Sequence, residues 1–148
     1  MRIIIISLFI FSGTLMSCAQ DINPNDIPSV VLNTFKTNFP DARDVEWEKH
    51  GDDYEVEFDH NLIDHNAYID AMGELILYKY DIKPSELPEA VKNTIQVDFK
   101  DYQIDDAELV EKDGEKLYEV ELESNITDRQ VVFTQDGQVT ENAYSFID

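Results

Sequence analysis

The sequence predicts an α+β protein of two tandem α-β4 repeats, each with one helix packed on a four-stranded antiparallel sheet. The first observation is an echo: Tyr54-Glu-Val-Glu-Phe58 returns 64 residues later as Tyr118-Glu-Val-Glu-Leu122. Both copies alternate apolar and acidic residues with a period of two, which is typical of a strand with one buried and one solvated face. An apolar stripe with four-residue spacing precedes each copy and predicts an amphipathic helix.

The two predicted helices begin at matching proline-containing segments that are 60 residues apart. The first runs from Ile27 to Phe39 and the second from Leu87 to Phe99. Their apolar stripes are Ile27, Val31, Phe35 and Phe39 in one, and Leu87, Val91, Ile95 and Phe99 in the other. Helices of this length are marginal alone, so each must pack against a sheet.

Alternating segments and turn residues predict four strands in each repeat. They lie at residues 44–48, 54–59, 67–70 and 75–80, and again at 107–109, 118–123, 130–134 and 139–146. The polar segment Asp59–Asn66 is predicted to be a loop between the second and third strands. The offset between the copies grows from 60 to 62 to 64, which predicts insertions in the helix–strand connection and in the first hairpin turn.

The predicted boundaries are a signal peptide at 1–18, a tether at 19–26, a first repeat at 27–82 and a second at 83–148. A unit of about 60 residues is near the lower limit for folding alone. We therefore expect the repeats to pack together or to share one continuous sheet.

The N-terminus has the features of an export signal. A positive start, Met1-Arg2, is followed by an apolar stretch that is too short for a comfortable membrane span. The stretch ends at Leu15-Met16-Ser17-Cys18, which resembles a bacterial lipobox and predicts lipidation of Cys18. Cleavage after Ala19 by an ordinary signal peptidase is the alternative. The protein is expected in the periplasm or at the outer membrane as a lipoprotein, or else secreted.

The composition restricts the partners. The chain has 32 acidic and 11 basic residues, a net charge of −21. Nucleic acid is excluded, since phosphate binding needs Lys and Arg, and a membrane is reached only through a lipid anchor. A protein or peptide with a basic surface fits this charge. Cys18 is the only cysteine, so no disulfide forms within the chain.

These patterns resemble a known family. The pattern Leu-Pro-x-Ala-Val before the second helix, Phe-Pro-Asp-Ala after the first, and the strands with Tyr-Glu-Val-Glu are similar to the PepSY-like, β-lactamase-inhibitor-like family of exported bacterial proteins. The resemblance covers residues 27 to about 146 as two copies. It implies a protein of two α-β4 repeats that binds or inhibits other proteins, and it brings no catalytic residue.

Two sets of residues are candidate sites. The first is the outward-facing acids of the echo, Glu55, Glu57, Glu119 and Glu121, which would meet a basic partner or simply form a solvated face. The second is the repeated Asp-His pair, Asp59 and His60 with Asp64 and His65, whose side chains are of types that bind zinc.

The sequence therefore favours a non-catalytic envelope or secreted binding module for a protein or peptide, without a cofactor. A cation-binding acidic protein is the first alternative. A carboxylate-based hydrolase is the second, because paired carboxylates can perform acid–base catalysis.

Overall fold

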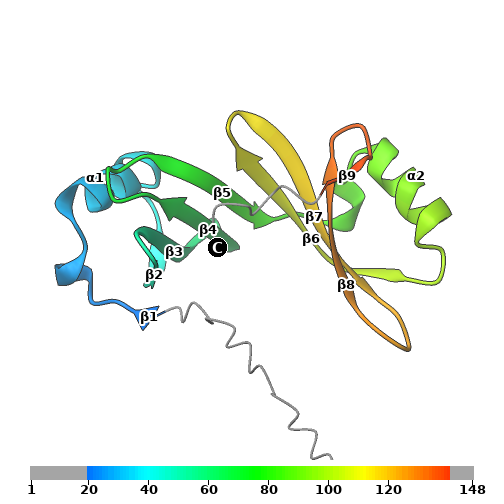
Figure 1. The fold of residues 1–148 in the computed structure, drawn as a ribbon, viewed down its shortest axis with the longest axis horizontal. Coiled ribbons are helices and arrows are strands. Elements are labelled where there is room, and N and C mark those ends of the chain that lie inside the picture. The colour runs from blue at the N-terminus through cyan, green and yellow to red at the C-terminus, as the bar shows by residue number, and fades with distance from the viewer. Residues whose placement is uncertain (1–19, 141–148) are drawn as a thin grey trace, which may run out of the picture.

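The computed structural model describes residues 20–140 and contains one nine-stranded antiparallel sheet (Figure 1). Each strand pairs with the next along the chain. The strands are β1 (Gln20–Asp21), β2 (Arg43–His50), β3 (Asp53–His60), β4 (Ile63–Ile69), β5 (Leu75–Asp81), β6 (Gln103–Lys112), β7 (Glu115–Glu123), β8 (Arg129–Thr134) and β9 (Val139–Thr140). The helices are α1 (Ser29–Asn38) and α2 (Glu89–Asp98), and each follows a short 3-10 helix, η1 (Pro24–Asp26) or η2 (Pro84–Glu86).

The two repeats share the sheet through the pairing of β5 with β6. The expectation of a helix and antiparallel strands in each repeat is confirmed, and of the two arrangements left open the shared sheet is the one observed. The alternative, in which each repeat has a separate sheet, is wrong. The sequence did not predict β1, which pairs with β2 at the edge of the sheet.

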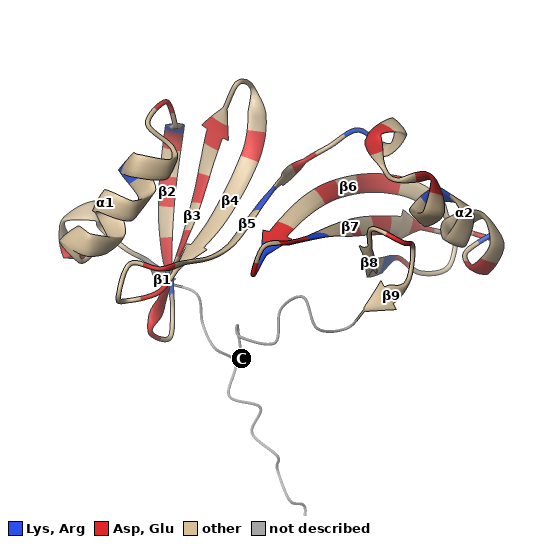
Figure 2. Cartoon of the chain, turned by 90° about the horizontal axis from the view of Figure 1, so that it is seen from above, with Lys and Arg blue, Asp and Glu red and all other residues tan. Residues whose placement is uncertain are grey.

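Both helices cover the same face of the sheet. Tyr78 packs into the core under α1, and Tyr80 packs into the core under α2. These tyrosines are two residues apart on β5, so they point to one face. The helices lie at opposite ends of the molecule (Figure 2), and the other face carries no helix. We call this second surface the helix-free face.

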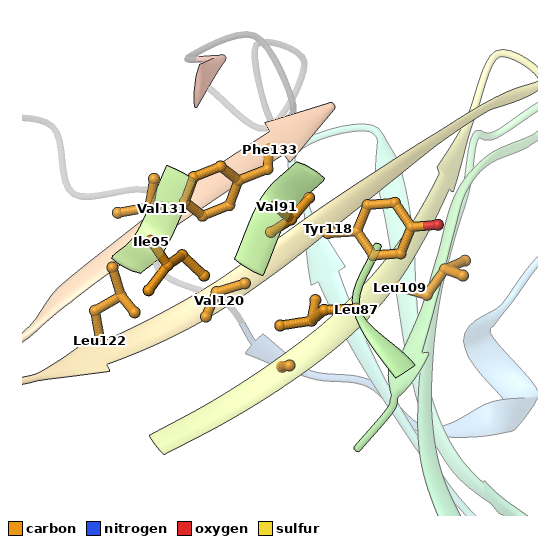
Figure 3. Close-up of a cluster of buried hydrophobic side chains, with 10 residues drawn as sticks. Leu87, Val91, Ile95, Leu109, Tyr118, Val120, Leu122, Val131 and Phe133 are labelled. Carbon is orange, nitrogen blue, oxygen red and sulfur yellow. The ribbon is translucent and has the colours of Figure 1, made fainter. Parts of the chain in front are cut away.

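The predicted apolar stripes form the two cores. Val31 and Phe35 of α1 are buried, as are Val91 and Ile95 of α2. In the second repeat the helix packs over Val120, Leu122 and Phe133 (Figure 3). Burying each such side chain stabilises the fold by about 1.5–3 kcal/mol before chain entropy is counted, so each helix depends on its sheet.

A repeated polar contact fixes each helix to a hairpin turn. The Thr34 hydroxyl donates to the Gly73 carbonyl at 2.7 Å, and the Thr94 hydroxyl donates to the Gly137 carbonyl at 2.8 Å. Both glycines have positive φ, +87° and +82°. At Gly137 a Cβ atom would lie 2.6 Å from the Ala90 carbonyl oxygen, so only glycine fits there.

The expected loop at Asp59–Asn66 is wrong. Only Asn61 and Leu62 lie between β3 and β4, both with positive φ, 56° and 65°. Two consecutive left-handed residues are typical of a tight hairpin turn of type I′. The polar residues on either side belong to strands, because one face of those strands is not covered by a helix.

Of the two predicted insertion positions, the first hairpin turn is confirmed and the helix–strand connection is wrong. Glu48 pairs with Glu55 and Glu108 pairs with Glu119, so β2 and β6 are related by an offset of 60. The register shifts also match, between Arg43 and Glu46 in β2 and between Ile104 and Asp106 in β6. The four extra residues of the second repeat therefore all lie in the β6–β7 hairpin, which extends its ladder instead of lengthening the helix–strand connection.

Three further expectations concern the ends of the chain. The predicted tether at 19–26 contains β1 and η1, so its described part is ordered structure rather than a free linker. The last predicted strand, 139–146, is described only as β9, and its remainder lies outside the described residues, as does the predicted signal peptide. Within residues 20–140, neither helix has the length and apolar character needed to span a bilayer.

Substitution of Gly137 tests the helix–hairpin contact. Gly137→Ala is expected to lose about 1–2 kcal/mol of unfolding free energy from its left-handed backbone and about 1–3 kcal/mol more from the clash with the Ala90 carbonyl. Gly114→Ala is the matched control, since Gly114 has φ +78° with nothing within 4 Å of a new Cβ. Equal losses for the two variants in urea unfolding would contradict the contact.

Candidate functional site

The helix-free face has an apolar centre with acidic flanks. Tyr68, Leu77, Val110 and Leu117 form a buried cluster on it, where β4 to β7 meet. Glutamates of β2 and β3 lie on one side of this cluster, and glutamates of β6 and β7 on the other. The face thus combines a buried apolar centre with strong negative charge on both sides.

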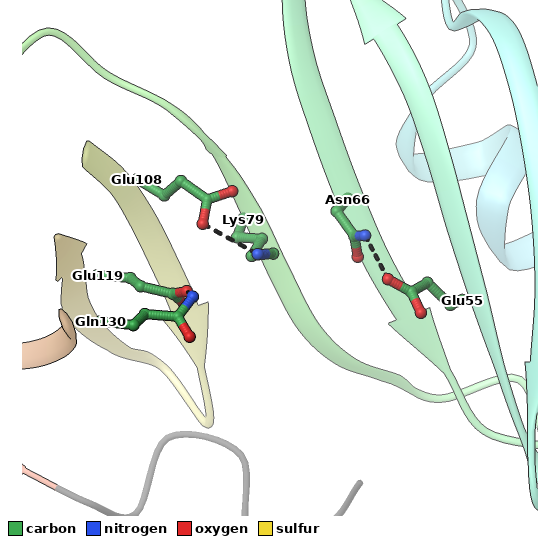
Figure 4. Close-up of polar contacts among 6 residues, drawn as sticks. All are labelled: Glu55, Asn66, Lys79, Glu108, Glu119 and Gln130. Atoms are coloured by element: carbon green, nitrogen blue, oxygen red, sulfur yellow. Dashed lines mark hydrogen bonds and ion pairs between the residues drawn. The ribbon is translucent and has the colours of Figure 1, made fainter. Parts of the chain in front are cut away.

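The sequence predicted that Glu55 faces outward and is exposed to solvent, and the second part of this prediction is wrong. Glu55 points to the helix-free face as predicted, but only 8% of its surface is exposed. The Asn66 amide donates to Glu55 Oε1 at 2.5 Å (Figure 4), and the His50 ring nitrogen Nε2 lies 2.5 Å from Oε2. The sequence pattern gave the direction of the side chain, but the neighbours that cover it come from other strands.

Glu119 repeats this arrangement in the second half and is also buried, with 3% exposure. Gln130 donates its amide to Glu119 Oε1, and Asn66 and Gln130 are themselves 64 residues apart (Figure 4). Burial raises the pKa of Glu119 to about 7, although Lys79 opposes the rise. Its other oxygen, Oε2, is buried without a hydrogen-bond partner.

Lys79 links the two repeats on this face. It lies on β5 of the first repeat and forms an ion pair with Glu108 of the second, with Nζ 2.9 Å from Oε2 (Figure 4). Burial by itself lowers the pKa of Lys79, but the carboxylates of Glu119 and Glu108 outweigh it and raise the pKa overall. The junction of the repeats therefore holds a stable ammonium ion among carboxylates.

Glu57 and Glu121, the other two candidate acids, are exposed as predicted. Glu57 lines a hollow of about 490 Å³ between β2 and β6, which we call the acidic groove. Seven of its eleven lining residues are acidic and one is a lysine: Asp44, Glu46, Glu57, Phe58, Asp59, Asp64, His65, Asn66, Lys79, Asp81 and Glu108.

The acids of the groove repel one another. Burial, followed by the charges of Glu55, Glu48 and Glu46, raises the pKa of Glu57. Burial, followed by Asp106 and Glu108, raises the pKa of Asp81 to about 6. A positive charge placed in the groove would relieve this repulsion.

The four residues of the suggested metal site do not converge. Asp59 and Asp64 face each other across β3 and β4. His65 lies on the opposite face, between the rings of Phe58 and Tyr78. Successive residues of a strand point to opposite faces, so the aspartates and His65 cannot bind one ion together.

His65 has the contacts of a neutral core histidine. Its Nδ1 lies 2.7 Å from the Tyr78 hydroxyl, and its Nε2 lies 3.3 Å from the His60 carbonyl oxygen. The carbonyl can only accept, so Nε2 carries the proton and Nδ1 accepts from Tyr78. Burial lowers the pKa of His65, which agrees with an uncharged ring.

A different set with metal-ligand chemistry was missed from the sequence. Glu48, His50 and Glu55 bring one ligand atom each to within 4.8 Å of one another. Glu48 and His50 are two apart on β2, and Glu55 faces Glu48 from β3. Only the hairpin register unites them, although the spacing Glu-x-His before a Gly-containing turn was visible.

The buried Glu119 carboxyl gives a prediction about pH. Its pKa is about 7 in the folded protein and 4.5 when unperturbed, so between these values the folded state holds more protons. The free energy of unfolding should therefore fall as pH rises from 4.5 to 7, by about 3 kcal/mol from this group. In Glu119→Gln this part of the slope is lost, and the contribution of Asp81 remains.

Urea unfolding at several pH values measures the slope. The control is Glu121→Gln, which removes the same charge from an exposed position two residues away and should keep the wild-type slope. Identical slopes in the Glu119→Gln and wild-type proteins would contradict the assignment.

Comparisons with known proteins agree with this architecture. A crystal structure of a DUF2874 family protein from Bacteroides uniformis is similar with a TM-score of 0.71 and 21% identity, over 80% of this chain and 92% of that chain. One described as "putative periplasmic proteins" from Bacteroides eggerthii has a TM-score of 0.71 and 23% identity, over 80% and 92%. A BLIP-like protein from Bacteroides fragilis has a TM-score of 0.65 and 18% identity, over 76% and 82%. These likenesses show the fold.

Among curated proteins, none matches the sequence significantly. The family model described as "Putative beta-lactamase-inhibitor-like, PepSY-like" matches twice, at residues 13–77 and 70–141. The predicted resemblance is thus confirmed, and the chain belongs to the PepSY-like family as two tandem copies.

Proposed function

We propose that this protein is a non-catalytic binding module that holds a basic segment of another protein or a peptide in the acidic groove. The observation that carries the proposal is the excess of seven acidic side chains over one lysine in a single hollow. Charge complementarity of this kind speeds encounter and selects the partner.

Lys79 provides an internal example of the proposed contact. Its ammonium group lies in the groove, 2.9 Å from Glu108 Oε2, with 18% of its side chain exposed. A lysine of a partner could form the same kind of ion pair with Glu57 or Asp81, which also line the groove and are repelled by neighbouring carboxylates. Of the acids first singled out, Glu57 is the proposed contact residue in the groove. Glu55 and Glu119 are buried and are not proposed to contact the partner.

The family supports a binding role rather than catalysis, because its description is inhibitor-like and one similar structure is BLIP-like. The hydrolase alternative would need a carboxyl that meets substrate near neutral pH. Glu119, with a pKa of about 7, is almost fully buried and lines neither the acidic groove nor the smaller hollow beside it. The hydrolase alternative would therefore rest on Asp81, which lines the groove and has a pKa of about 6.

We also propose that the protein acts in the periplasm, attached to a membrane through a lipid on Cys18. The lipobox-like segment supports this, as does the description of the B. eggerthii structure as periplasmic. Cys18 lies two residues before β1, so a lipid there would hold the sheet close to the membrane surface.

Calorimetric titration with an acetylated tetralysine peptide tests the groove. The mature protein is expected to bind it, more weakly at 300 mM than at 50 mM salt because exposed charges are screened. The double variant Glu57→Lys and Asp64→Lys should lose at least about tenfold in affinity, which corresponds to about 1.4 kcal/mol.

The matched control is the double variant Asp98→Lys and Asp101→Lys. It changes the net charge by the same amount at exposed positions at and after the end of α2. If both variants weaken binding equally, overall charge and not the groove attracts the peptide. A wild-type protein that does not bind the peptide at 50 mM salt would overturn the proposal.

Mass spectrometry of the N-terminal peptide tests the anchor. A lipidated protein begins at an acylated Cys18 and partitions with membranes, and Cys18→Ser should release it into the soluble fraction. A mature protein that begins at Gln20 would instead show cleavage after Ala19 and exclude the lipid.

A further inference from the structure

The first hairpin carries a group of metal-ligating side chains outside the acidic groove. Glu48 and His50 lie on one face of β2, and Glu55 lies opposite Glu48 on β3. The His50 nitrogen Nε2 lies 2.5 Å from Glu55 Oε2 and 3.5 Å from Glu48 Oε2. We propose that these three side chains bind a divalent transition-metal ion such as Zn²⁺, independently of the proposed function.

In the second repeat, the equivalent pair of glutamates contacts a cation. By strand register, Glu108 and Glu119 correspond to Glu48 and Glu55, and Val110 corresponds to His50. The ammonium of Lys79 binds Glu108 and is attracted to Glu119, so the second pair holds a cation. Among the described residues, His50 is the only basic side chain that forms an ion pair with Glu48 or Glu55, and Lys79 is attracted to Glu55 without pairing with it.

The buried His50 nitrogen Nε2 faces two carboxylates but makes no regular hydrogen bond. Nε2 is buried and makes no hydrogen bond of normal geometry, although a carboxylate oxygen lies 2.5 Å away. Buried ring nitrogens normally have a partner. A metal ion between the ring and the two carboxylates would satisfy all three groups.

The spacing of the ligand atoms is close to that of a zinc site. Zn–N and Zn–O bonds of about 2.0–2.1 Å in a tetrahedron place ligand atoms about 3.3 Å apart. The 3.5 Å separation between His50 and Glu48 fits this value, and Glu55 must move away by about 0.8 Å to match it. One imidazole with two carboxylates suits zinc and its neighbours better than calcium, which prefers oxygen alone.

The surrounding residues orient the ligands and leave access to solvent. Asn66 donates to Glu55 Oε1, which directs Oε2 of the same carboxylate toward His50. The Tyr68 ring packs edge-on against the His50 ring, with 6.0 Å between centroids. Such contacts from outside the ligand set usually fix ligand orientation. Glu48 and Glu55 also line a hollow of about 310 Å³, so water can complete the coordination.

Thermal unfolding and calorimetry of the mature protein with ZnCl₂ test the site, with Cys18→Ser present so that no free thiol competes. Zinc should raise the melting temperature of the otherwise wild-type protein, and calcium should not. His50→Lys places an ammonium group beside the two glutamates, as Lys79 does in the second repeat. This variant should be as stable as the wild-type protein in EDTA, but its affinity for zinc should fall at least tenfold.

His60→Asn is the control for zinc binding to histidine elsewhere and should leave the affinity unchanged. In NMR spectra, zinc should shift the imidazole signals of His50 more than those of His60 and His65. Zinc stabilisation that persists in His50→Lys, or that calcium reproduces, would overturn the proposal, and so would the absence of any zinc effect.

Discussion

The hydrogen-bonded ladder between β5 and β6 is the constraint on which the rest of the structure depends. It joins the end of the first repeat to the first sheet strand of the second, from Leu77 with Lys112 to Asp81 with Glu108. Because the ladder makes one sheet, both helices are held on the same face and the opposite face runs unbroken across both repeats. It also places Lys79 within reach of Glu108, so the charges of the two halves interact directly.

The sequence predicted those features that depend on local periodicity. The apolar stripe of Val91 and Ile95 and the alternation of Val120 with its glutamate neighbours are set by helix and strand geometry, and the structure has both. Prediction from the sequence failed where residues far apart in the chain determine the burial of a side chain. Glu55 and Glu119 have the pattern of solvated residues but are covered by side chains of neighbouring strands. The turn at Asn61–Leu62 was hidden because no glycine marks it.

The two repeats have kept one geometry and changed its charges. In both, a buried glutamate accepts a hydrogen bond from an amide on the next strand, Asn66 or Gln130. A second glutamate faces it across the hairpin. Two like charges at such a place are unfavourable without a neighbouring positive group. At that place the second glutamate pair contacts Lys79, and the first contacts His50.

The order of the strands also affects how the chain folds. Every strand pairs with its neighbours in sequence, so within residues 20–140 most strand pairs are hairpins, while β1 with β2 and β5 with β6 pair across an intervening helix. Hairpin pairing of this kind keeps many contacts local, which favours faster folding than pairing between distant strands would. The first repeat can therefore assemble before the second is complete, and β5 then offers an edge on which β6 forms. This sequence of events limits the time during which unpaired strand edges are exposed.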